Sequence, residues 1–206
     1  MSTRRFAGGV AAVLATALLI GAPVPAAAQF SKSYKFLDAV RKKDGQEVTD
    51  DLSEPGTQIV NTRDVTTGET GLHIVTARHD LTWMSFLIGK GADVNLRDNK
   101  GNTPLELASN LGFVEGVNLL VQSGAKVDEP DATGATPLIV AVQRRDIAMM
   151  RVLLKAGANP DRADNTGRTA RDYARDVDRS GNLLNEINDN AAKRQQGAAG
   201  SYGPRL

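Results

Sequence analysis

Cysteine is absent from the 206 residues, which excludes disulfide bonds, thiolate metal sites and a cysteine nucleophile. Histidine occurs only twice, so few side chains are available for a metal centre. Aromatic residues make up 4% of the chain, too few for a core built on stacked rings. The formal net charge is +1, and no excess of one sign indicates nucleic acid as a partner. The remaining composition, 41% hydrophobic and 24% charged, is typical of a globular protein.

The first 28 residues have the pattern of a secretory signal. Arg4 and Arg5 supply positive charge, residues 7–22 carry none, and 26–28 is a run of alanines that suits cleavage. We expect cleavage after Ala28 and export to the periplasm, with secretion into the medium as the alternative destination. An uncleaved membrane anchor is disfavoured because the apolar run falls short of the roughly 20 residues that span a bilayer. Removal of this segment takes away two basic residues and no acidic one, which changes the net charge to −1.

The rest of the chain repeats itself every 33 residues. Glycine, threonine, leucine and alanine all recur in one register, which is far more specific than the spacing of a single residue type. The recurring positions are Gly68, Gly101, Gly134 and Gly167; Thr70, Thr103, Thr136 and Thr169; Leu87, Leu120 and Leu153; and Ala108, Ala141 and Ala174. The sequence therefore predicts stacked copies of one structural unit.

Each unit is expected to contain a turn followed by two short helices. Gly101 suits the turn, Thr103 offers an N-cap oxygen, and Pro104 fits the first helical position, where no N–H is needed. A second helix is expected at about 113–122, ended by Gly124 in the left-handed region. One such pair cannot bury its apolar faces alone, so stacking on neighbouring pairs is required.

These residues resemble the ankyrin repeat. The pattern D-x-x-G-x-T-P-L-x-x-A stands at 98–108 and again at 131–141, and the tail G-A-D-V-N stands at 91–95. The resemblance covers about 34–188 and implies an all-α solenoid of helix-turn-helix units with β-turn tips. We expect a signal peptide at 1–28, an ankyrin-repeat domain at 29–190 and a disordered tail at 191–206. Within the domain we expect an N-terminal cap at 34–63, repeats at 64–97, 98–130 and 131–163, and a C-terminal cap at 164–190.

Three departures from the pattern carry further predictions. Gly71 replaces the usual proline and should weaken the start of its helix by up to roughly 1 kcal/mol relative to alanine. The second helix of the C-terminal cap, 182–188, is polar and is expected to be fragmentary. Trp83 shares its slot with Gly116 of the next unit, which predicts that the indole lies over that glycine. An exposed tryptophan that anchors a partner is the alternative.

The sequence contains no complete motif for catalysis or cofactor binding, and the repeat pattern accounts for the residues that resemble parts of one. His73 occupies a position where ankyrin repeats commonly place a histidine that bonds neighbouring turns, and His79 is expected in a solvated turn. The segment 89–91 lacks the additional glycine and the Ser or Thr of a phosphate-binding loop. The Asp-x-x-Gly tips lack the distal ligands of a calcium loop. We therefore expect a non-enzymatic protein with no catalytic residue, bound cofactor or metal.

The resemblance implies that a partner binds on the concave side of the stack, which the turn tips and the first helices line. The matching positions are Thr66, Thr67, Glu69, Arg78, Asn99, Lys100, Asn102, Asn110, Leu111, Thr133, Gln143, Arg144, Asn165, Thr166 and Arg168. Arg78, Arg144 and Arg168 would favour an acidic partner, although exposed arginines also serve solubility alone.

The sequence therefore predicts an exported, monomeric scaffold that binds another protein rather than nucleic acid, and that makes no stable membrane insertion once the signal is removed. Two alternatives stay open: a stress-protective accessory to an exported enzyme, and a secreted effector that binds a host protein.

Overall fold

The computed structural model describes residues 32–53 and 58–199, with side chains described as far as Asn190. The predicted signal at 1–28 lies outside these residues. Within them every regular element is helical, and a lone β-bridge joins Arg63 to Thr70. The elements are α1 (Lys32–Lys42), α2 (Gly45–Leu52), the 3-10 turn η2 (Ile59–Asn61), α3 (Gly71–Ala77), α4 (Leu81–Gly89), α5 (Pro104–Leu111), α6 (Val114–Gln122), α7 (Pro137–Gln143), α8 (Ile147–Lys155), α9 (Ala170–Val177) and α10 (Asn182–Ala199).

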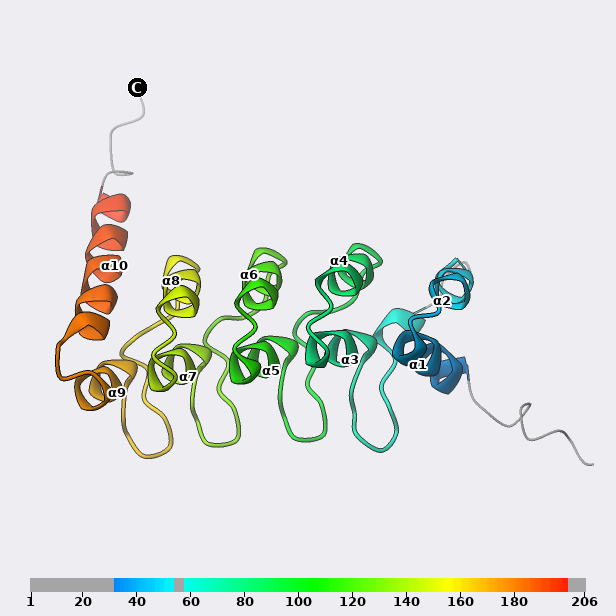
Figure 1. The fold of residues 1–206 in the computed structure, drawn as a ribbon, viewed down its shortest axis with the longest axis horizontal. Coiled ribbons are helices and arrows are strands. Elements are labelled where there is room, and N and C mark those ends of the chain that lie inside the picture. The colour runs from blue at the N-terminus through cyan, green and yellow to red at the C-terminus, as the bar shows by residue number, and fades with distance from the viewer. Residues whose placement is uncertain (1–31, 54–57, 200–206) are drawn as a thin grey trace, which may run out of the picture. The chain divides into compact units, whose positions relative to one another are not determined.

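The helices of the repeats are arranged in two rows, with the turn tips extending on the side of the first helices (Figure 1). Each repeat contributes two helices that contact each other: α3 with α4, α5 with α6, and α7 with α8. Contacts between repeats join α1, α3, α5, α7 and α9 into one row, and α4, α6, α8 and α10 into the other. The predicted all-α solenoid of stacked helix pairs is confirmed.

Threonine side chains fix where the first helices begin. Thr70, Thr103, Thr136 and Thr169 each accept a hydrogen bond from the backbone N–H three residues further on, the N-cap arrangement that satisfies an otherwise unpaired donor. After the second helices, Gly91, Gly124 and Gly157 take φ values of 89°, 89° and 102°, which a residue with a Cβ adopts only with strain. The 33-residue repeat thus sets where the first helix of each unit begins and where its second helix ends.

The core consists of the same slots repeated along the stack. The leucines at 72, 105 and 138 of the first helices and those at 87, 120 and 153 of the second helices are at most 1% exposed. Full burial of one such side chain contributes about 1.5–3 kcal/mol relative to exposure. Ala108, Ala141 and Ala174 are fully buried where first helices meet, because a small side chain allows their close approach. Each repeat therefore completes its core only against its neighbours.

The expected contact between Trp83 and Gly116 is wrong. A Cβ added to Gly116 would lie 2.4 Å from Cδ1 of Phe113, and its three nearest atoms all belong to that ring. Phe113 is the N-cap of α6 and lies three residues before Gly116, so its ring is on the same side of the helix and occupies the space beside the glycine. The Trp83 ring instead packs edge-on against Phe86, at 5.7 Å between centroids. The Arg78 guanidinium lies over the indole, with Cζ 5.5 Å from the ring centroid.

The last helix described, α10, is longer and more regular than expected. In place of a fragmentary helix at 182–188, α10 runs unbroken from Asn182 to Ala199, and so enters the segment expected to be a disordered tail. Leu183 and Ile187 lie one turn apart and are almost fully buried, which anchors the first half of α10 to α8 and α9. The continuation at 191–196 reads Ala-Ala-Lys-Arg-Gln-Gln, all of them good helix formers. Residues 200–206 lie outside the described chain.

Candidate functional site

An aspartate organises each turn tip. Oδ1 of Asp131 accepts hydrogen bonds from the backbone N–H of Thr133 at 2.8 Å and of Ala135 at 3.0 Å. The Asp131 N–H in turn donates to the Ala135 carbonyl at 3.0 Å, which closes the loop. Asp98 and Asp164 make the same bonds in their own tips, so the tips are well-defined loops.

Asparagines connect some tips to their neighbours. The backbone and side-chain N–H groups of Asn165 donate to the Thr133 and Ala132 carbonyls, at 3.1 and 3.2 Å. Asn99 ties its tip to the preceding one in the same way, through bonds of 2.9 Å to Thr67 and Thr66. Ala132 occupies the equivalent position in the tip between them; it has no side-chain amide, and among the residues described its backbone N–H does not donate to the preceding tip. The seam between the tips at 98–102 and 131–135 therefore lacks this tie.

His73 joins two repeats from inside the stack. Its ring is fully buried, and Nδ1 accepts a hydrogen bond from the Thr70 N–H at 3.2 Å. The ring proton therefore sits on Nε2, which donates to the carbonyl of Asn102 in the next repeat at 3.0 Å. This is the structural bridging expected for His73. Burial lowers the pKa of the imidazole, so the neutral ring is favoured.

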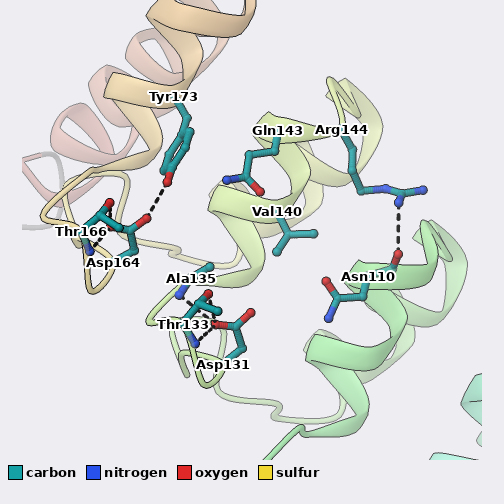
Figure 2. A pocket seen from close by; sticks show the side chains of 10 residues that line it. All are labelled: Asn110, Asp131, Thr133, Ala135, Val140, Gln143, Arg144, Asp164, Thr166 and Tyr173. Atoms are coloured by element: carbon teal, nitrogen blue, oxygen red, sulfur yellow. Dashed lines mark hydrogen bonds between the residues drawn. The ribbon is translucent and has the colours of Figure 1, made fainter.

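A groove of about 380 Å³ lies where the last two tips meet α7, as Figure 2 shows. We call the surface formed by the turn tips and the first helices the tip face. The groove lies on this tip face, and its lining is polar apart from Ala135, Val140 and the ring of Tyr173. The full lining is Asn110, Asp131, Thr133, Ala135, Val140, Gln143, Arg144, Asp164, Thr166 and Tyr173.

Two half-buried carboxylates face this groove. Oδ1 of Asp164 accepts a hydrogen bond from the Thr166 hydroxyl at 2.6 Å, and Oδ2 accepts one from the Tyr173 hydroxyl at 2.6 Å. These bonds, that of Thr166 first, hold the pKa of Asp164 far below its usual range, so it is ionised at neutral pH. Oδ1 of Asp131 carries the loop bonds, while its Oδ2 accepts no hydrogen bond within the described residues.

The comparison with known families agrees with this architecture. Residues 36–131 match a family described as ankyrin repeats (3 copies), and residues 120–174 match one described as ankyrin repeats (many copies). The chain belongs to the ankyrin-repeat family. Ankyrin repeats form protein–protein interaction domains. Among the helices described, none combines the length and hydropathy needed to cross a bilayer, and the side chains described hold no metal-type cluster of three or more His, Asp or Glu.

The arginines expected to bind a partner make contacts within the ankyrin stack. The Arg144 guanidinium donates to the carbonyl of Asn110, at the end of α5, over 3.1 Å. Arg78 donates to the carbonyl of Val40, in the last turn of α1, over 2.6 Å. The last carbonyls of a helix have no partner within it and form its negative end, which explains the attraction to a guanidinium. Arg168 lies over the ring of Tyr173, 4.0 Å from its centroid, and pairs with Asp176.

The groove gathers five of the residues chosen from the sequence: Asn110, Thr133, Gln143, Arg144 and Thr166. The other ten are not part of its lining: Thr66, Thr67, Glu69, Arg78, Asn99, Lys100, Asn102, Leu111, Asn165 and Arg168. Among them, Asn99, Asn102 and Asn165 take part in bonds between repeats.

Sequence reasoning missed Asp131, Val140, Asp164 and Tyr173 as groove residues. A signal for the two aspartates was present, since each opens a D-x-x-G tip. They were treated as turn formers alone, yet a carboxylate that organises a loop with one oxygen can still present its charge. For Tyr173 no signal existed, because its placement depends on how α9 packs against α7.

Proposed function

We propose that this protein is an exported scaffold that binds another protein on the tip face of its ankyrin stack. The observation that carries the proposal is the groove beside α7. The side chains of Asn110 and Gln143 line it, are exposed, and form no hydrogen bond within the described part of the chain. Polar side chains that the fold does not use are available to a partner. In contrast, the aliphatic faces of the helices are occupied by stacking.

The contacts of His73 support a binding role for the protein rather than catalysis. His73 is buried and bonded on both ring nitrogens, and the exposed ring of His79 stacks on Phe113 at 4.6 Å between centroids. Neither lines the groove. A general base needs a free nitrogen within reach of a substrate, which His73 does not provide.

A photo-crosslinking residue placed at position 143 in living cells tests the binding surface. Lys155, at the exposed end of α8 in the same repeat, provides the matched control position. We expect a crosslinked adduct from position 143 that is absent from position 155. Equal adducts from both positions, or none from 143 and one from 155, would overturn the proposed surface.

Export is proposed on the pattern of the first 28 residues, and the mature N-terminus tests it directly. Mass spectrometry of the periplasmic fraction should find a chain that starts at Gln29. A chain that retains residues 1–28 and stays in the cytoplasm would contradict export, and a mature chain found only in the medium would favour secretion.

A further inference from the structure

The charge of the groove is opposite to that of the arginines from which an acidic partner was expected. Of the ten lining residues, Asp131 and Asp164 are acidic and Arg144 is basic. Arg144 is directed away from both aspartates, toward the end of α5, where it bonds the Asn110 carbonyl (Figure 2). The nearby Arg168 is paired with Asp176. The charge that remains uncompensated on the groove wall is therefore negative.

We infer that the groove receives a positively charged side chain, lysine or arginine, from the protein partner. This inference rests on the proposed function and gives its partner a chemical character. Asp131 and Asp164 come from successive tips and border the same hollow, so one cation can approach both. Oδ2 of Asp131, which the loop does not use, is the acceptor for its N–H groups.

The remaining lining suits the rest of such a side chain. Val140 provides apolar surface for the methylene stem that precedes the charge, as does the part of the Tyr173 ring that Arg168 does not cover. The amides of Asn110 and Gln143 provide further acceptors at the rim. An acidic side chain would instead meet two carboxylates, and Arg144 would have to leave its bond to α5 in order to reach it.

Asparagine substitutions remove the charge and keep the loops. In each tip Oδ1 of the aspartate accepts the bonds from its loop, and the Oδ1 of asparagine can accept the same bonds. Oδ2 of Asp164 also accepts a hydrogen bond from the Tyr173 hydroxyl, and in Asp164→Asn the side-chain amide can instead donate to that hydroxyl oxygen. Asp98 holds the equivalent position in the preceding tip and does not line the groove. Asp98→Asn is therefore a matched control for Asp131→Asn and Asp164→Asn.

The experiment uses N-acetyl-arginine methylamide as the probe and its citrulline analogue, which has nearly the same shape without the charge. Amide NMR shifts are followed while each compound is titrated into the protein expressed from its full-length sequence. We expect the arginine compound to shift the signals of Thr133, Ala135 and Thr166, and the citrulline compound to shift them weakly. Asp131→Asn and Asp164→Asn should each weaken the response about fivefold, the effect of losing one partly exposed charge pair.

The control variant and the crosslink separate the two proposals. Asp98→Asn should respond like the wild type. Equal shifts with both compounds, or shifts that both groove variants leave unchanged, would overturn the cationic partner. If position 143 still crosslinks to a protein whose capture is the same in Asp131→Asn and Asp164→Asn cells, the binding surface stands and the charge inference fails. If position 143 captures no protein, the proposed function itself fails.

Discussion

Arg144 reaches across a repeat boundary and donates a hydrogen bond to the carbonyl of Asn110, 3.1 Å away. The bond stabilises the C-terminal end of α5 from the next repeat. The guanidinium also lies close to Gly112, where an added Cβ would be 2.5 Å from Nη2. An arginine that sequence reasoning assigned to a partner thus serves the stack. Its contribution to stability can be measured apart from binding.

Arg144→Met, which keeps the aliphatic stem, should lower the free energy of unfolding by about 1 kcal/mol, because the last carbonyls of α5 lose a charged donor. Urea denaturation monitored by circular dichroism measures the change. Unaltered stability together with lost partner capture would instead assign Arg144 to the partner.

The missing tie between two tips offers a stabilising substitution. Asn at position 132 can donate to the carbonyls of Lys100 and Asn99, as Asn165 does one repeat later. A Cβ added to Gly68 would lie 2.3 Å from Asn99, and one added to Gly134 would lie 2.5 Å from Asn165, each asparagine belonging to the next tip. A Cβ added to Gly101 would meet no atom of another described segment within 4 Å. The seam is thus more open than its neighbours.

We expect Ala132→Asn to raise the free energy of unfolding by up to about 1 kcal/mol, and Asn165→Ala to lower it by a similar amount. Thermal denaturation of the two variants, run beside Asn99→Ala, provides the comparison. A loss of stability in Ala132→Asn would mean that the seam is fixed by other contacts.

Burial of His73 predicts that stability depends on pH. The pKa of the buried ring lies below the ordinary value of 6.5, so the unfolded chain binds a proton more readily than the folded one. Stability from this group is present above pH 6.5 and is lost as the pH falls from 6.5 toward the folded pKa. The proton would also remove the Nδ1 acceptor of the Thr70 N–H.

His73→Gln should flatten that pH dependence, since glutamine does not titrate, while His79→Gln should retain it because His73 is still present. Urea midpoints between pH 5 and 7.5 measure the slope. An equal slope in wild type and His73→Gln would assign the dependence to other groups.

Gly71 provides a test of helix propensity within the stack. A Cβ at this position would meet Leu87, Phe36 and Val40 at 3.4–3.7 Å, which is ordinary van der Waals contact. Gly71→Ala should therefore stabilise the protein by about 0.5–1 kcal/mol, as alanine loses less conformational entropy in a helix. Gly116→Ala should destabilise it, because its Cβ would collide with Phe113. Calorimetry of both variants measures the sign of each stability change. A loss of stability in Gly71→Ala would show that the packing around position 71 is too tight for a methyl group.

The sequence predicted the features that follow from the 33-residue period. Thr103 and Pro104 marked a helix start, Gly124 marked a helix end, and His73 was assigned its bridging role from the family pattern. Such features are local or recur in every unit. The capping roles of Arg78 and Arg144 were missed because they depend on where the neighbouring helix ends, which the period does not specify.

The groove shows the same limit. Asn110, Gln143 and Thr166 were selected because a repeat position fixes which face a residue occupies. Asp164 was treated as a turn former alone, and its bond to the Tyr173 hydroxyl depends on where α9 lies, which the repeat pattern does not specify. The predicted contact of Gly116 was wrong for a related reason. Trp83 and Gly116 were compared because they share a repeat position, and Phe113, three residues before the glycine, was overlooked.

The most direct test of binding on the tip face is amide hydrogen exchange on the protein with and without the partner that position 143 captures. Binding there predicts slowed exchange at 131–135 and 164–168, the two tips that border the groove, with α6 and α8 unchanged. Protection confined to α6 and α8, with exchange at both tips unaltered, would contradict binding on the tip face.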